Sequence, residues 1–176
     1  MIISVEQAKA LIDLAEWKDE KIKMKLKAVE QTIRAYTNNN FQKRGCRVQA
    51  SIENGVLVSE SHSPLPFSVG DTIQISESRL NGGLYTILAT GDTTITVSED
   101  LKAEDVVLVT KVVYPADVID CCLNLLEWSK NYGGKVGIKS ETLSRHSVTY
   151  EDSATLFMGF PIGILNGLKL YKKARF

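Results

Sequence analysis

The sequence has no long hydrophobic run and no paired cysteines. In its 176 residues, the apolar runs stay far below the roughly 20 residues of a membrane-spanning helix, and the N-terminus lacks the basic and then apolar segments of a secretory signal. Its three cysteines, Cys46, Cys121 and Cys122, show no Cys-x-x-Cys spacing. We therefore expect no membrane association, a cytoplasmic location in the producing cell, and reduced cysteines that pack as small apolar side chains.

The residue types that catalysis and metal binding require are also scarce. There are only two histidines, His62 and His146, and neither has a Cys, His or carboxylate neighbour at the spacing of metal ligands. Ser144 lies near His146, but a catalytic serine also needs a third group that orients the base. The glycine pairs match no phosphate-binding loop. The sequence therefore predicts no catalytic residue, no cofactor and no metal, so we expect the protein not to be an enzyme.

Charge is balanced overall but divided unevenly along the chain. Lysine plus arginine equals aspartate plus glutamate at 21 each, whereas residues 46–113 hold four basic and nine acidic residues. An acidic middle segment argues against DNA binding there, because phosphates need cationic partners. Carboxylate pairs such as Glu104-Asp105 lie in predicted turns and are interpreted as solvated charges.

Residues 115–132 form the predicted central helix. Pro115 suits a helix start, two aspartates follow near the positive end of the helix dipole, and Gly133-Gly134 predicts a left-handed stop. Apolar residues cover most of the circumference, namely Val118, Ile119, Cys121, Cys122, Leu123, Leu125, Leu126 and Trp128. A surface helix needs only one apolar stripe, so we expect this helix to be covered on several sides, by its own neighbours or partly by another subunit.

Two helices are predicted before residue 40. Ser4 and Gln7 have the spacing of a capping box, which predicts a first helix over residues 5–17. A second begins at Asp19 and ends at the asparagines of residues 38–40. Its apolar stripe is Ile22, Leu26, Val29, Ile33 and Tyr36, and five lysines on its other faces are interpreted as a solvated surface: Lys18, Lys21, Lys23, Lys25 and Lys27.

From Cys46 the hydrophobic period becomes alternating, and Asn54-Gly55 is a strong hairpin turn sequence. Six short strands are predicted over residues 46–113, as in a small antiparallel barrel or sandwich. The predicted fold is α+β, a small α-helical bundle of three to four helices over residues 1–44 and 114–176 with an inserted antiparallel β-barrel-like subdomain at 46–113. Residues 135–158 are predicted to form an extended polar arm, and residues 159–176 a final helix with a basic tail.

Several short segments resemble the head-tail connector, or adaptor, proteins of long-tailed bacteriophages. They are Ile-Arg-Ala-Tyr-Thr-Asn-Asn-Asn-Phe at 33–41, Tyr-Pro-Ala-Asp-Val at 114–118, Lys-Ser-Glu-Thr-Leu at 139–143, Ser-Val-Thr-Tyr at 147–150, Gly-Phe-Pro at 159–161 and Leu-Lys-Leu-Tyr-Lys-Lys at 168–173. The resemblance covers residues 1–44 and 114–176. Residues 67–91 separately resemble small β modules of phage structural proteins, and the smaller connectors lack such an insert.

The resemblance implies a protein that binds without catalysis. Copies would form a ring, expected to be a dodecamer, beneath the portal protein of the filled head, extend the DNA channel and receive the stopper or tail-completion protein. DNA would pass through without specific binding, and the location would be the virion's head-tail junction, after assembly in the host cytoplasm. The implied subunit and portal interface is Leu123, Leu126, Trp128, Lys139, Ser140, Glu141, Arg145, Tyr150, Tyr171, Lys172, Lys173 and Arg175.

Two other functions are compatible with the residues. A nucleic-acid-binding regulator would use the lysine-rich second helix and the basic tail on phosphates, with the barrel serving for dimerisation. A small enzyme would place its site around His146 and Glu141, and would need an ordered arm, because a catalytic site must be preorganised.

Overall fold

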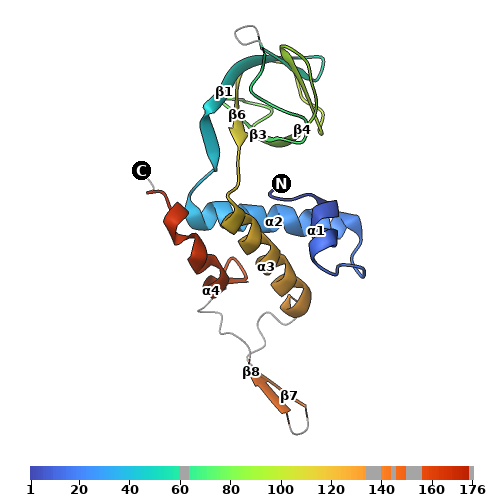
Figure 1. The fold of residues 1–176 in the computed structure, drawn as a ribbon, viewed down its shortest axis with the longest axis vertical. Helices are drawn as coiled ribbons and strands as arrows, with labels where there is room; N and C mark the ends of the chain where they lie inside the picture. Colours follow the sequence, from blue (N-terminus) through green and yellow to red (C-terminus); the bar gives the residue numbers. More distant parts are fainter. Residues whose placement is uncertain (60–63, 134–139, 144–145, 150–155, 175–176) are drawn as a thin grey trace. The chain divides into compact units, whose positions relative to one another are not determined.

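The computed structural model describes residues 1–59, 64–133, 140–143, 146–149 and 156–174 (Figure 1). The chain forms two compact units. The barrel unit comprises Met1 and Asn40–Val113, and the helical unit comprises Ile2–Asn39 and Tyr114–Phe176. The inserted unit therefore begins at Asn40, earlier than the predicted Cys46. No helix within the described ranges has the length and apolar character that a membrane crossing requires.

Helix α1 spans Val5–Leu11 and is shorter than predicted. The capping box is present, with Ser4 accepting from the Gln7 N–H and Gln7 accepting from the Ser4 N–H. The chain is already extended at Ile12, and the Asp13 carboxylate then accepts a hydrogen bond from the Ala15 N–H. A local side-chain bond of this kind competes with helix continuation. Leu14, which the predicted helix over residues 5–17 included, lies in the loop after α1 and is buried there. Its apolar side chain therefore contributes to the core without being part of a helix.

Helix α2 spans Asp19–Thr37 and follows the prediction closely. Ile22, Leu26, Val29 and Ile33 are all buried, as their spacing predicts. The helix ends at Asn38, whose φ of 49° is left-handed and whose N–H still bonds to the Arg34 carbonyl. Four of the five lysines are exposed, and the fifth is half-buried.

Helix α3 spans Ala116–Tyr132 and directly follows Pro115. It contacts α2, β10 (Phe160–Pro161), α4 (Ile162–Leu165) and the 3₁₀ helix η2 (Asn166–Tyr171), so its wide apolar surface is covered on several sides by the same chain. Of the glycine pair predicted to form a left-handed stop, Gly133 is not left-handed. Gly133 has a φ of −60° and its N–H bonds to the Ser129 carbonyl, so the helical hydrogen-bond series simply continues through it. Gly134 lies outside the described residues.

The segment predicted as an extended arm contains a two-stranded antiparallel hairpin of β7 (Ser140–Leu143) and β8 (His146–Thr149). The predicted final helix is also divided. It consists of β10 (Phe160–Pro161), α4 (Ile162–Leu165) and the 3₁₀ helix η2 (Asn166–Tyr171). The partner strand of β10, β9 (Leu156–Phe157), lies at the end of the predicted arm. Gly163 and Gly167 lower the helix propensity of this stretch, which accounts for a short α-helix followed by 3₁₀ turns.

The barrel unit contains six antiparallel strands that close in the order β1-β2-β5-β4-β3-β6. The strands are β1 (Gln42–Glu53), β2 (Val56–Val58), β3 (Thr72–Ser76), β4 (Gly83–Thr90), β5 (Thr94–Val97) and β6 (Glu104–Val112). The predicted six strands are thereby confirmed, and the barrel is the correct alternative to a sandwich. With four α-helices and this barrel among the described residues, the fold is α+β.

The barrel core is made by the inward residues of the alternating strands. Its fully buried members include Ile52, Leu57, Ile73, Ile75, Ile87, Val107 and Val109. Asn54 and Gly55 have φ values of 50° and 80°, which is the left-handed pair that an Asn-Gly hairpin turn requires. At the other end of β1, the Val113 N–H donates to the Phe41 carbonyl at 3.0 Å, so the chain leaves the barrel beside the point where it enters.

Candidate interaction surface

The cysteines of α3 are packing residues and not nucleophiles. Burial, with a smaller contribution from the Glu30 charge, raises the pKa of the Cys122 thiol to about 12. Burial and the nearby Asp120 raise the pKa of Cys121 to about 11. Both groups are protonated at neutral pH, whereas a nucleophilic cysteine needs its thiolate. Among the described residues, no group of three or more His, Cys, Asp and Glu side chains is placed to hold a metal ion.

The three helix residues expected at the subunit interface differ in accessibility. Leu126 is 0% exposed, so its contacts lie within this chain and a partner cannot reach its side chain in this conformation. Leu123 and Trp128 are only half-buried. Trp128 packs between the rings of Tyr132 and Phe160, at centroid distances of 6.3 and 5.9 Å. The accessible part of the predicted interface on α3 is therefore Leu123 on one flank and an aromatic group around Trp128 on the other.

A polar stripe separates these two flanks of α3. Its members recur at steps of three and four and are all exposed: Asp117, Asp120, Asn124, Glu127 and Asn131. Three of the five are carboxylates. The surface of the central helix that remains open to a partner is thus acidic along its middle and apolar at its edges.

Tyr171, another predicted interface residue, is engaged within the chain. Its hydroxyl donates to the Asp117 carboxylate, with oxygen–oxygen distances of 2.8 and 2.7 Å. This hydrogen bond is the main cause that raises the pKa of Tyr171. The Tyr171 carbonyl accepts from the Asn39 side chain at 3.1 Å. Tyr171 therefore joins η2 to the start of α3 and to the end of α2.

The next two predicted residues continue along the end of α2. The Lys172 ammonium lies 3.9 Å from the centre of the Tyr36 ring, which is a cation–π distance. The Lys173 N–H donates to the Thr37 carbonyl at 2.8 Å, and the Asn38 side chain donates to the Lys173 carbonyl at 3.2 Å. Lysines of the basic tail thus dock on α2 through backbone and ring contacts.

Of the other predicted residues, Ser140 and Glu141 lie in β7, paired with Thr149 and Val148 of β8. Four more lie outside the described residues, namely Lys139, Arg145, Tyr150 and Arg175.

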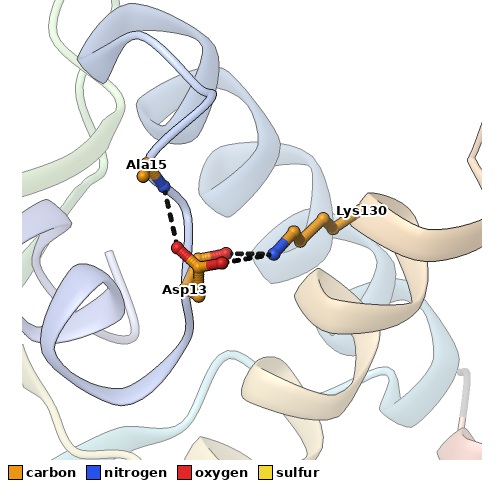
Figure 2. Close-up of polar contacts among 3 residues, drawn as sticks. All are labelled: Asp13, Ala15 and Lys130. Atoms are coloured by element: carbon orange, nitrogen blue, oxygen red, sulfur yellow. Dashed lines mark hydrogen bonds and ion pairs between the residues drawn. The ribbon is translucent and has the colours of Figure 1, made fainter.

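A contact that the sequence did not reveal fixes the α1–α2 loop (Figure 2). Lys130, in the last turn of α3, donates to the Asp13 main-chain carbonyl and to its carboxylate, the latter at 3.3 Å. The Ala15 N–H, and next Lys130, lower the pKa of Asp13. Asp13 and Lys130 are 117 positions apart, so no local pattern could have paired them.

Comparison with protein-family models found no match, and a search of curated proteins found no significant relative. The function therefore has to follow from the residues and contacts of this chain.

Proposed function

We propose that this protein is a head-tail connector of a long-tailed bacteriophage. The observation that carries the proposal is that three of the segments resembling connectors meet in the helical unit. Asn38 and Asn39 of the 33–41 segment bond to the backbone of residues 171–174, and Tyr171 of the 168–173 segment bonds to Asp117 of the 114–118 segment. Short matching segments that are dispersed in sequence but hydrogen-bonded together support a shared scaffold.

The surfaces around this junction suit binding more than chemistry. Leu123 and the aromatic group around Trp128 offer apolar area on α3, which is what the interface between neighbouring copies of a ring requires. The β7–β8 hairpin is mostly polar in sequence, and with Lys139, Arg145, Tyr150 and Arg175 it is the proposed portal-docking element. The helical unit would act as a small bundle whose copies form the ring, expected to be a dodecamer.

In this role the ring extends the DNA channel below the portal and receives the stopper or tail-completion protein. The overall balance of charge and the acidic insert suit a channel through which DNA passes without adhering, because clustered cations would retain phosphates. The protein would assemble in the host cytoplasm and remain in the virion at the head-tail junction.

Quantitative mass spectrometry of purified particles tests the proposal. The copy number of this chain is measured against that of the portal protein, with the major capsid protein as the internal standard. We expect a number equal to that of the portal. Absence of the chain from finished particles would overturn the connector function.

The exposed lysines of α2 favour a second candidate, a nucleic-acid-binding regulator. Lys21, Lys23 and Lys27 are exposed in α2, and Lys18 is exposed at its N-cap. Such cationic side chains can contact phosphates. This function predicts binding to a fluorescein-labelled duplex that weakens steeply as salt rises from 50 to 200 mM, by about a thousandfold or more if six or more phosphates are contacted. The connector function predicts no measurable binding to the same duplex at physiological salt.

A further inference from the structure

Helix α2 has a face on which every exposed charge is positive. Between residues 21 and 31, the exposed side chains are Lys21, Lys23, Met24, Lys27, Ala28 and Gln31, and we call this set the basic face. The Met24 side chain is 73% exposed, although methionine is usually buried. The two exposed acids of α2, Asp19 and Glu20, lie before this face in the first turn, where Asp19 forms an ion pair with Lys9. The basic face thus combines three cations with one large accessible apolar side chain.

The polar stripe of α3 has the opposite charge. Its charged residues are Asp117, Asp120 and Glu127, and no lysine or arginine is exposed between residues 116 and 132. The Asp120 carboxylate accepts a hydrogen bond from the Asn124 side chain at 3.1 Å and remains exposed. Leu123 lies beside the stripe, between Asp120 and Glu127 in sequence, and is half-buried. The acidic stripe therefore has an apolar neighbour near its middle.

The basic face and the acidic stripe also match in spacing. A helix rises about 1.5 Å per residue, so the first and last lysines of the basic face are about 9 Å apart along the axis. The last two carboxylates of the stripe are about 10.5 Å apart by the same measure, a difference that flexible lysine side chains can span. In each helix one apolar side chain, Met24 or Leu123, lies between the charges.

The two surfaces are directed away from each other within one chain. Cys122 lies on the side of α3 that faces α2, because the charge of Glu30 in α2 contributes to its raised pKa. Successive helix residues are about 100° apart, so Asn124 in the stripe is about 200° around α3 from Cys122. Met24 is likewise two positions from Leu26, which is buried within the helical unit. One copy therefore cannot join its own two surfaces, whereas two copies can.

We propose that the basic face of α2 in one copy binds the acidic stripe of α3 in the next copy. The lysines pair with the carboxylates, and Met24 packs against Leu123. This contact joins two different surfaces, so it repeats from copy to copy and closes into a ring when the rotation between copies allows. The inference rests on the proposed function, because it names the two surfaces through which neighbouring copies of the connector ring meet.

The contact between two isolated copies is expected to be weak. Exposed ion pairs contribute little individually and are screened by salt. We expect a dissociation constant on the order of 100 μM at low salt. Sedimentation velocity of the full chain measures this self-association. At about 50 mM salt the weight-average sedimentation coefficient should rise between about 10 and 500 μM protein, and at about 500 mM salt the rise should be at least about threefold smaller.

Charge reversal on either surface should prevent self-association. The α2 variant is Lys23→Glu with Lys27→Glu, and the α3 variant is Asp120→Lys with Glu127→Lys. In each variant the two surfaces carry charge of the same sign and repel, so association should weaken at least about tenfold. The combined fourfold variant exchanges the two signs and should recover association to within about threefold of the parent. An equimolar mixture of the two double variants should recover it as well.

The matched control is Lys43→Glu with Lys102→Glu, two exposed lysines of the barrel unit that give the same change in net charge as the α2 variant. Its association should equal that of the parent. Urea unfolding verifies that each variant is folded. The proposal is overturned if the parent stays monomeric at about 500 μM protein and about 50 mM salt, or if neither the fourfold variant nor the mixture recovers association. Duplex DNA binding by the parent that the α2 variant loses would assign the basic face to nucleic acid and overturn it too.

These outcomes are distinct from failure of the connector function. A chain that equals the portal in copy number but does not respond to charge exchange would keep the connector function and lose this interface. A chain that associates through exchanged charges but is absent from particles would keep the interface and lose the connector function.

Discussion

A buried carboxylate–phenol pair anchors the start of α3 to α2. Glu30 is only 4% exposed, and its carboxylate accepts a hydrogen bond from the Tyr114 hydroxyl at an oxygen–oxygen distance of 2.5 Å. Burial first, and then the charge of Glu30, raise the pKa of Tyr114 well above its usual range, while Arg34 acts in the opposite direction. The phenol therefore remains a donor to Glu30 at every pH at which the protein is handled.

Replacing Tyr114 with phenylalanine removes this donor and keeps the ring. A hydrogen bond to a charged group contributes about 1.5 to 3 kcal/mol, because the buried acceptor is otherwise left without that partner. We expect Tyr114→Phe to lower the free energy of unfolding by that amount. Arg34 stays near the pair, so the loss should not reach the roughly 3 to 5 kcal/mol of a buried charge stripped of its counter-charge.

Tryptophan fluorescence in a urea titration follows the unfolding of the helical unit, which contains Glu30 and Tyr114. The chain has two tryptophans, Trp17 and Trp128, and both belong to the helical unit. With a urea dependence of about 1 to 3 kcal/mol/M, the expected midpoint decrease is roughly 0.5 to 3 M.

The matched control is Tyr132→Phe, which removes an equivalent hydroxyl from a residue that is 46% exposed, and it should change stability by less than about 0.5 kcal/mol. If Tyr114→Phe shifted the midpoint no more than this control, the phenol would not be needed to satisfy Glu30 and the reasoning would be refuted.

Two further predictions concern the alkaline range and the first hairpin. Because the pKa of Cys122 is raised to about 12, its contribution to stability is complete below the unfolded pKa and is lost as pH rises toward 12. Between pH 8 and pH 10 the raised pKa of this thiol should lower the free energy of unfolding by about 1 to 2 kcal/mol. The urea midpoint of Cys122→Ala should therefore fall less over that interval than that of the parent, and equal slopes would contradict the assignment. Gly55→Ala should destabilise the barrel by about 1 kcal/mol, because φ is 80° at Gly55, and thermal unfolding followed by circular dichroism measures this loss. The control is Gly45→Ala, where a Cβ would meet open space and φ is not in the left-handed region, so stability should not change. Equal losses in the two variants would show that the turn is not the cause.

Periodicity predicted the parts of the fold whose neighbours are set by local geometry. The α2 stripe of Ile22, Leu26, Val29 and Ile33 is buried as its spacing requires, and the Asn54-Gly55 turn has the expected left-handed backbone. Helix α1 was predicted too long because Leu14 continued the apolar spacing, although it reaches the core from a loop. Whether a single leucine is buried from a helix or from a loop depends on tertiary contacts, and the helical spacing of the sequence fits both cases.

The interaction surface could be predicted only in part, because its key contacts join distant positions. Leu123, Leu126 and Trp128 are all apolar residues of the same predicted helix, and the sequence does not distinguish them. In the structure only Leu126 of the three is completely covered by its own chain. Tyr171 is 54 positions from Asp117, and neither residue alone indicates a partner. The sequence therefore identified the right helix and tail, while the structure separates residues that hold the unit together from those still accessible.

The barrel is inserted so that each unit closes through its own hydrogen bonds. The Val113 N–H bonds to the Phe41 carbonyl, so both ends of the insert lie one hydrogen bond apart. In the helical unit, the residues that flank the insert in sequence bond within that unit, Asn39 to Tyr171 and Tyr114 to Glu30. These bonds involve no barrel residue. This arrangement agrees with a connector resemblance confined to residues 1–44 and 114–176.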